Sequence, residues 1–302
     1  GVSNFPLYRA MNIRLKITSW FESLFTEAQP LSRRIFIIAV YAWFLVQWLF
    51  LFPLKNVLWG TSNAFYRHGF DDGILENIIY RLIYDPEIFP WIWWTHVVAC
   101  VLAVLPSLWS AIPRCMVWIT GLMLYYSAYR VFNSGMLLML LLSCYSIFIH
   151  GRTRRWPLIL LSNVFVGLCY FQITWVYFSS AVFKWMGTQW VEGTAVYYAL
   201  NIERFGGHSI DWSQGWICML SMMITCMVLL FQTLFPALIW LRKWRMQMIL
   251  IGLFLHIGVG VLLHLWDFAL AMLVAYTLFV RDEDWKRLAK LVFRRTLTST
   301  PE

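Results

Sequence analysis

Long apolar stretches are the feature of this sequence that most restricts its fold. A transmembrane helix needs about 17–25 mainly apolar residues. The stretch from 246 to 280 is too long for one crossing, and the polar His264 and Asp267 indicate where it turns. The sequence therefore predicts an all-α polytopic bundle of about eight transmembrane helices, at residues 34–53, 89–110, 114–132, 135–150, 156–184, 212–240, 246–263 and 266–280.

Composition excludes the soluble alternatives. Hydrophobic residues make up 61% of the 302 residues and charged residues 13%, whereas an average soluble domain has about 45–50% and about 25%. A soluble protein with that surface would aggregate, and 23 Phe, 19 Trp and 14 Tyr exclude a disordered chain. A formal charge of +9 would suggest nucleic acid in a soluble protein. Here it indicates basic cytoplasmic loops, with membrane lipids and not nucleic acid as the partner.

The basic residues are divided unevenly between the two sides of the predicted bundle. With the N-terminus inside, all but six of the 24 Lys and Arg residues fall on the inner side. Cytoplasmic loops carry an excess of Lys and Arg, so this bias predicts an even number of crossings with both termini in the cytoplasm. The six outer basic residues are Lys55, Arg67, Arg81, Arg130, Lys184 and Arg204.

Three regions follow from this topology. Residues 1–33 are predicted to form a cytoplasmic segment. Within it, the sequence of residues 13–24 predicts an amphipathic interfacial helix. Residues 34–280 form the membrane domain, with outer loops at 54–88 and 185–211, and residues 281–302 form a basic cytoplasmic tail. The first outer loop is long and acidic, and its apolar residues recur at helical spacing, which predicts a surface helix. The six cysteines are dispersed and the six histidines show no ligand spacing, so no metal is expected.

Polar side chains gather at the outer end of the fifth span. Because a helix has 3.6 residues per turn, Tyr177, Ser180 and Lys184 share one face there. Gln172 lies about 120° from Lys184 and joins them only if the helix bends. Lys184 has two interpretations. It is a lysine that extends to the lipid head groups, or a partly desolvated amine that acts as a base.

Other ionisable side chains lie in or near the predicted membrane region, where such groups are costly and are functional candidates by default. His256 falls near the middle of the seventh span, where it makes a structural bond between helices or serves a site. His264 and Asp267, at the following outer turn, pair with each other or line a site. Arg130 and Asn133 close the third span at the same level. Together these residues predict a site on the outer face.

Two runs of sequence are similar to a known family. The run VYFSSAVFKWMGTQWVEGTAVYYAL at 176–200, preceded by Gln172, resembles the central signature of the vitamin K-dependent gamma-carboxylase membrane domain. That domain belongs to the HTTM (horizontally transferred transmembrane) superfamily. The run FLHIGVGVLLHLWDFALAMLVAYTLFV at 254–280 resembles the second signature, a membrane-embedded histidine followed by an aromatic-rich turn and a final helix. The resemblance spans most of residues 30–290.

The resemblance implies a function. In the carboxylases the matching lysine deprotonates vitamin K hydroquinone, and the oxygenated quinone then removes a proton from a peptide glutamate, to which carbon dioxide adds. This implies Lys184 as the base, in a bacterial inner membrane protein whose site is periplasmic or extracellular. The implied cofactor is a quinone or hydroquinone, and the implied partner is an exported peptide or small secreted protein. The cofactor would be held by Asn133, Gln172, Tyr177, Ser180 and His256, with Arg130, Glu192, His264 and Asp267 as further pocket residues.

The sequence also departs from the carboxylases. Gly135 falls where they carry a histidine that helps to hold the quinone, and one extra residue separates Lys184 from Trp190. The large non-membrane domain is absent from the sequence given, which is typical of stand-alone bacterial HTTM proteins. Two functions remain open: a quinone-dependent, carboxylase-like lyase that modifies a peptide, and a non-catalytic membrane partner that matures or anchors a secreted protein. A transporter is disfavoured because the sequence has no inverted repeat.

Overall fold

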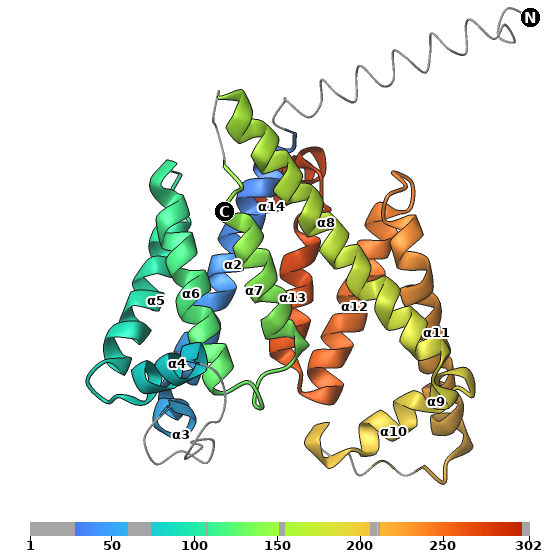
Figure 1. The fold of residues 1–302 in the computed structure, drawn as a ribbon. Coiled ribbons are helices and arrows are strands. Elements are labelled where there is room, and N and C mark those ends of the chain that lie inside the picture. The colour runs from blue at the N-terminus through green and yellow to red at the C-terminus, as the bar shows by residue number, and fades with distance from the viewer. Residues whose placement is uncertain are drawn as a thin grey trace, which may run out of the picture.

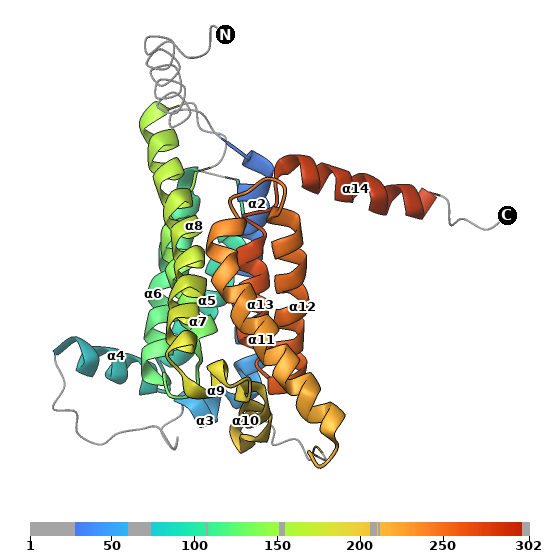
Figure 2. The same ribbon diagram turned by 90° about the vertical axis from the view of Figure 1, so that its right-hand side faces the viewer.

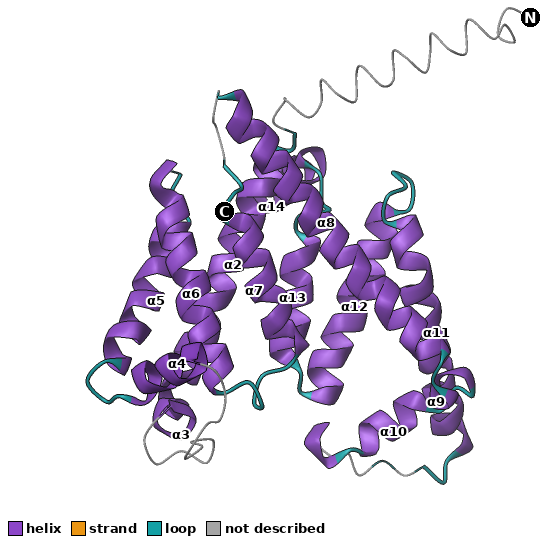
Figure 3. Ribbon diagram, in the orientation of Figure 1, coloured by secondary structure: helices purple, strands orange, loops and turns teal. Residues whose placement is uncertain are grey.

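The computed structural model describes residues 28–59, 74–106, 108–150, 155–205, 210 and 212–297. Within these ranges every regular element is a helix (Figure 3), which confirms the all-α prediction for them. The interfacial helix predicted at 13–24 lies outside the described residues. The main helices are α2 (Pro30–Leu51), α3 (Lys55–Trp59), α4 (Ile74–Tyr84), α5 (Phe89–Ala103), α6 (Ala111–Ser127), α7 (Ser134–Ser146), α8 (Trp156–Trp185), α9 (Thr188–Val191), α10 (Ala195–Asn201), α11 (Gly215–Leu238), α12 (Arg245–Leu263), α13 (Trp266–Tyr276) and α14 (Asp282–Leu297).

A helix stands at each of the eight predicted spans, but these helices differ in length. Four of the described helical segments are long and apolar enough to cross a membrane: α2 with its continuation to Trp59, α8, α11 and α12. Helices α5, α7 and α13 are apolar but shorter, at 15, 13 and 11 residues. Helix α6 has 17 residues. The structure therefore supports a helical membrane protein.

The helices pack in two groups with α7 and α13 between them (Figures 1 and 2). On one side α5 pairs with α6 and both adjoin the central helices through α2 and α7. On the other side α8 pairs with α11, and α12 contacts both α11 and α13. Phe36, Val40 and Phe44 of α2 are completely buried in the core, whereas Leu230 and Phe254 are exposed on the perimeter. An apolar perimeter around an apolar core is the pattern of helices that face lipid.

The two ends of the bundle differ in what they carry. Helices α2, α6, α8, α12 and α14 all begin at one end, which we call the inner end, and α3, α4, α9 and α10 lie at the opposite, outer end (Figure 1). Arg33, Arg114 and Arg245 therefore lie at the inner end, close to the starts of their helices. Lys184 lies at the outer end, in the last turn of α8. This separation agrees with the uneven distribution of charge along the sequence.

Arg114, one of the basic residues that the sequence assigns to the inner side, is buried and does not face solvent. Only 5% of its surface is exposed, and its guanidinium donates hydrogen bonds to the carbonyl oxygens of Ala103, Ser146 and Ile149, at 3.1, 2.9 and 2.7 Å. The carbonyls of Ala103 and Ser146 end α5 and α7, where helical oxygens lack partners within the helix, and Ile149 lies just after α7. Arg114 thus joins three helices at the inner end, because one side chain offers five donors to carbonyls that need them.

The predicted basic tail contains a further helix, α14. Its first turn carries Asp282, Glu283 and Asp284, and acidic side chains stabilise a helix at its N-terminal end, where the helix dipole is positive. Figure 2 shows α14 extending sideways from the inner end of the bundle. At the outer end, the surface helix predicted in the first loop is present as α4, which buries Ile83 and Tyr84 against the bundle.

Candidate functional site

Lys184 is held by a serine one turn earlier on α8. The i, i+4 spacing brings the two side chains together, and Lys184 Nζ donates a hydrogen bond to Ser180 Oγ at 2.8 Å. Ser180 Oγ in turn donates to Oε1 of Gln232 on α11, at 3.0 Å. A hydroxyl has only one proton. Because that proton goes to Gln232, the serine oxygen can only accept from the lysine.

The Lys184 amine faces an aromatic ring. Its Nζ lies 4.7 Å from the centroid of the Trp190 ring on α9, and the side chain is half-buried. Within the described ranges, Lys184 forms no ion pair with a carboxylate. The nearest acidic residue in the sequence, Glu192, is exposed at the end of α9. A partly buried amine without a carboxylate partner is an unusual arrangement, since buried charges are normally paired.

Tyr177 and His256, which the sequence placed on separate helices, are directly hydrogen-bonded. Tyr177 Oη lies 2.6 Å from His256 Nε2 and is also hydrogen-bonded to the hydroxyl of Tyr276 on α13. All three side chains are buried. The Tyr177 ring packs against Phe231 and Phe235 of α11. This triad therefore connects α8, α12 and α13, about two helical turns before Lys184 on α8.

The triad leaves one nitrogen without a partner. Two directions of donation are possible: Tyr276 to Tyr177 to His256, or the reverse. In both, Nδ1 of His256 is buried and lacks a hydrogen-bond partner among the described residues. A buried polar atom without a hydrogen bond destabilises the folded state, so such an atom often marks a functional role or the position of a bound molecule. His256 also packs its ring against Phe268, with centroids 5.6 Å apart.

Asn133 and Asp267 form a clasp between α7 and α13. Asn133 Nδ2 donates to Asp267 Oδ1 at 2.7 Å, and Asn133 Oδ1 accepts from the Gly135 backbone N–H at 2.8 Å, which caps α7. The Asp267 carbonyl accepts from Trp43 Nε1 at 3.3 Å. The Asp267 carboxylate thus accepts a hydrogen bond from Asn133. His264 adopts a left-handed conformation with φ 55° at the end of α12, where it turns the chain into α13.

Three predicted site residues stay apart from these groups. Arg130 is exposed, and its Nε donates to the hydroxyl of its neighbour Tyr129 at 3.3 Å. Gln172 is half-buried more than one turn before Tyr177, without a side-chain hydrogen bond to the described part of the chain. Glu192 faces outward, as described above. The structure thus joins Lys184 to Ser180 in one network and Tyr177 to His256 in a second, with Asn133 and Asp267 in a separate clasp.

Two residues that complete these networks were not identified from the sequence. Gln232 was detectable, since an amide inside a 24-residue apolar helix must find a partner in a low-dielectric surrounding. Nothing in the sequence distinguished Tyr276 as a hydrogen-bonding residue, because a tyrosine in an apolar helix is also typical of the aromatic belt at the membrane interface.

Comparisons with known proteins yield no match to a family model, a curated protein or a solved structure. The described residues contain no group of three or more His, Cys, Asp or Glu side chains that could hold a metal ion.

Proposed function

We propose that the chain is an HTTM-type bacterial inner membrane protein whose outer end binds a reduced quinone or isoprenoid lipid and modifies an exported peptide, with Lys184 as the base. About eight helices cross the membrane in this proposal, and both termini are cytoplasmic. The observation that supports this proposal is the environment of the Lys184 amine. Lys184 has no carboxylate partner among the described residues, and its hydrogen bond to Ser180 uses an N–H. The lone pair of the neutral amine is therefore available to a substrate proton.

The side chains around Lys184 provide some of the contacts that a reduced quinone would need. The Trp190 ring beside Lys184 offers a flat apolar surface to a quinol ring, and the amine offers a proton acceptor. The Asn133 side does not supply the histidine that carboxylases use. A Cβ atom at Gly135 would lie 2.6 Å from Phe268 Cα, so no side chain fits there. Gly135 permits the close packing of α7 against α13. In this proposal the residues that contact the ligand therefore lie on α8, α9 and α11.

Each protein group then has a distinct task. A reduced quinone would supply an acidic hydroxyl and reducing electrons. Lys184 accepts the hydroxyl proton, while Ser180 and Gln232 fix the direction of the amine through two hydrogen bonds. The Tyr177–His256–Tyr276 triad anchors the same face of α8 to α12 and α13. A base held in a fixed direction near its target accelerates proton transfer.

Oxygen uptake with vitamin K hydroquinone tests the proposal directly. We expect the full chain in nanodiscs to consume oxygen only when the hydroquinone is present, and Lys184→Met to reduce the rate about 10²–10⁴-fold, as is typical on removal of a general base. Lys243→Met is the matched control, because Lys243 is exposed at the inner end. Unchanged uptake in Lys184→Met would contradict the role of the lysine.

Gln232→Glu tests the electrostatic part of the proposal without removing the lysine. The new carboxylate would accept from Ser180 as the amide oxygen does, and would hold Lys184 in its charged form, in which it has no lone pair. We expect a loss of uptake of at least about tenfold with normal yield and monodispersity. If neither wild type nor variants take up oxygen and a small secreted protein co-purifies stoichiometrically, the non-catalytic partner function is favoured instead.

A further inference from the structure

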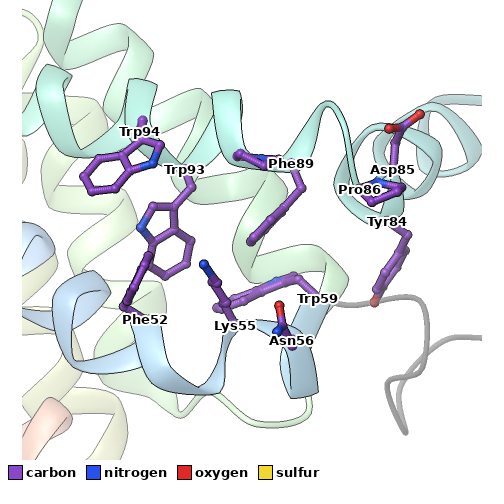
Figure 4. A pocket seen from close by; sticks show the side chains of 11 residues that line it. Phe52, Lys55, Asn56, Trp59, Tyr84, Asp85, Pro86, Phe89, Trp93 and Trp94 are labelled. Atoms are coloured by element: carbon purple, nitrogen blue, oxygen red, sulfur yellow. The ribbon is translucent and has the colours of Figure 1, made fainter.

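A pocket lies at the outer end, in the half of the bundle that does not contain Lys184 (Figure 1). It has a volume of about 330 Å³, within the range of about 300–1,000 Å³ that is usual for small-molecule sites. Helices α3 and α5, with the segments around them, form its walls (Figure 4). The side chains that matter for its chemistry are Phe52, Lys55, Trp59, Phe89, Trp93 and Trp94.

The aromatic walls of this pocket are fixed by hydrogen bonds to α6. Trp59 Nε1 donates to the Leu124 carbonyl at 3.2 Å and contacts Ser127 Oγ at 3.0 Å. Tyr84 Oη, on a neighbouring wall, donates to the Ser127 carbonyl at 2.9 Å. Trp59 also packs against Trp93, with ring centroids 5.6 Å apart. A pocket whose walls are already ordered loses little entropy when a ligand binds.

Lys55 gives the pocket a positive charge. Its side chain points into the space between Phe89, Trp59 and Trp93 (Figure 4). Its Nζ lies 4.0 Å from the centroid of the Phe52 ring, and it makes no ion pair with a described residue.

The acidic residue of the lining does not neutralise this charge. Asp85 turns its carboxylate away from the pocket (Figure 4), where it accepts from the backbone N–H groups of Glu87 and Ile88 at 2.8 and 3.1 Å. Among the residues that the structure describes, the pocket therefore combines apolar aromatic walls with one cation, Lys55, that has no ion-pair partner.

The rim of the pocket is apolar and exposed. Phe52 and Trp94 have exposed fractions of 37% and 52%, and their ring centroids are 6.2 Å apart. Exposed Trp and Phe side chains at the end of a transmembrane bundle are typical of the bilayer interface. A molecule that enters from the lipid would meet the aromatic rim first and the Lys55 ammonium inside.

We propose that this pocket binds the anionic head group, a carboxylate or phosphate, of a membrane amphiphile whose apolar chain leaves over Phe52 and Trp94. The anion would pair with Lys55, and the first part of the chain would pack against Trp59 and Trp93. This site is built from α3 to α6, whereas the Lys184 site is built from α8 to α12. Either proposal can therefore fail without the other.

Photo-crosslinking of the full chain in phosphatidylcholine nanodiscs tests this inference. The probes are a fatty acid with a diazirine in its chain and the corresponding fatty alcohol, and crosslinked peptides are located by mass spectrometry. We expect fatty-acid crosslinks within residues 52–59 and 89–94. Lys55→Met should reduce this capture roughly tenfold, as expected for loss of a charge-assisted hydrogen bond, and should leave capture of the alcohol unchanged.

Two further variants separate charge from shape. Arg81→Met is the matched control, because Arg81 is an exposed cation on neighbouring α4, and it should not alter capture. Asn56→Trp fills the pocket and keeps Lys55, and should reduce capture of both probes. Competition by unlabelled fatty acid or by phosphatidylglycerol identifies which source of the anion occupies the site. Crosslinks confined to other segments, or equal capture by wild type and Lys55→Met, would overturn the inference.

Discussion

Gly252 lies where the side chain of Tyr276 crosses α12. A Cβ atom at this position would collide with the Tyr276 hydroxyl and ring, and the triad with Tyr177 and His256 depends on that hydroxyl. Glycine here is therefore a packing requirement of the triad, although glycine is a poor helix former. Helix α12 tolerates Gly252 because the close packing of α13 at this position compensates for the lost helix propensity.

We expect Gly252→Ala to destabilise the protein by about 1–3 kcal/mol, the usual effect of overpacking, and to lower the melting temperature in detergent. Gly258→Ala on the same helix is the matched control. A Cβ there meets no atom within 4 Å, so it should raise stability slightly through helix propensity. If both alanine variants melted at the same temperature, the packing role of Gly252 would be wrong.

At the scale of elements, the inner ends of the helices are joined by buried charged groups. Arg114 ties α6 to the ends of α5 and α7. We expect Arg114→Met to lower the stability by about 3 kcal/mol, since three carbonyls lose a charged donor. Arg242→Met, at an exposed inner-loop arginine, should have almost no effect. Thermal unfolding of both variants in detergent checks this, and equal melting temperatures would refute it.

Asp282 joins the first turn of α14 to the start of α2. Its carboxylate accepts from the backbone N–H groups of Leu31 and Ser32 at 3.1 and 2.8 Å, and from the Ser32 hydroxyl at 2.8 Å. Burial alone would raise the pKa of this carboxyl, but these hydrogen bonds outweigh it and hold the pKa below its ordinary value of 3.8. They satisfy donors at the beginning of α2 that have no partner within the helix.

This pKa shift makes stability depend on pH. A carboxyl whose pKa is lower in the folded state binds protons more weakly there, so its contribution is complete above pH 3.8 and is lost as the pH falls through the folded pKa. We expect Asp282→Asn to lower stability at pH 7 and to flatten the acid limb of the stability curve. Glu283→Gln, at an exposed residue in the same turn, should preserve that limb. A curve unchanged by Asp282→Asn would exclude this role.

At the scale of the whole molecule, apolar periodicity and length were sufficient to predict the positions of the apolar helices and of α4, but they did not predict α9, α10 or α14. They did not predict which polar groups meet, because this depends on how α8, α11, α12 and α13 are rotated against one another. The common face of Tyr177, Ser180 and Lys184 followed from spacing within one helix. The partners Gln232 and Tyr276 lie on other helices, and a single sequence does not define such contacts. The sequence assigned Arg114 only to the inner side, because the position of a basic residue gives no sign of the carbonyl oxygens that its side chain will contact.

We expect the distribution of charge to decide the orientation of the molecule in the membrane. Excess Lys and Arg holds one end of a bundle in the cytoplasm, so the inner end should remain inside and Lys184 should face outward. We expect Glu192→Cys to react with a membrane-impermeant maleimide in intact cells, and Lys243→Cys to react only after permeabilisation. Both changes belong in a background with serine at the exposed Cys218 and Cys226. The reverse labelling pattern would place the Lys184 amine in the cytoplasm, where an exported peptide could not reach it.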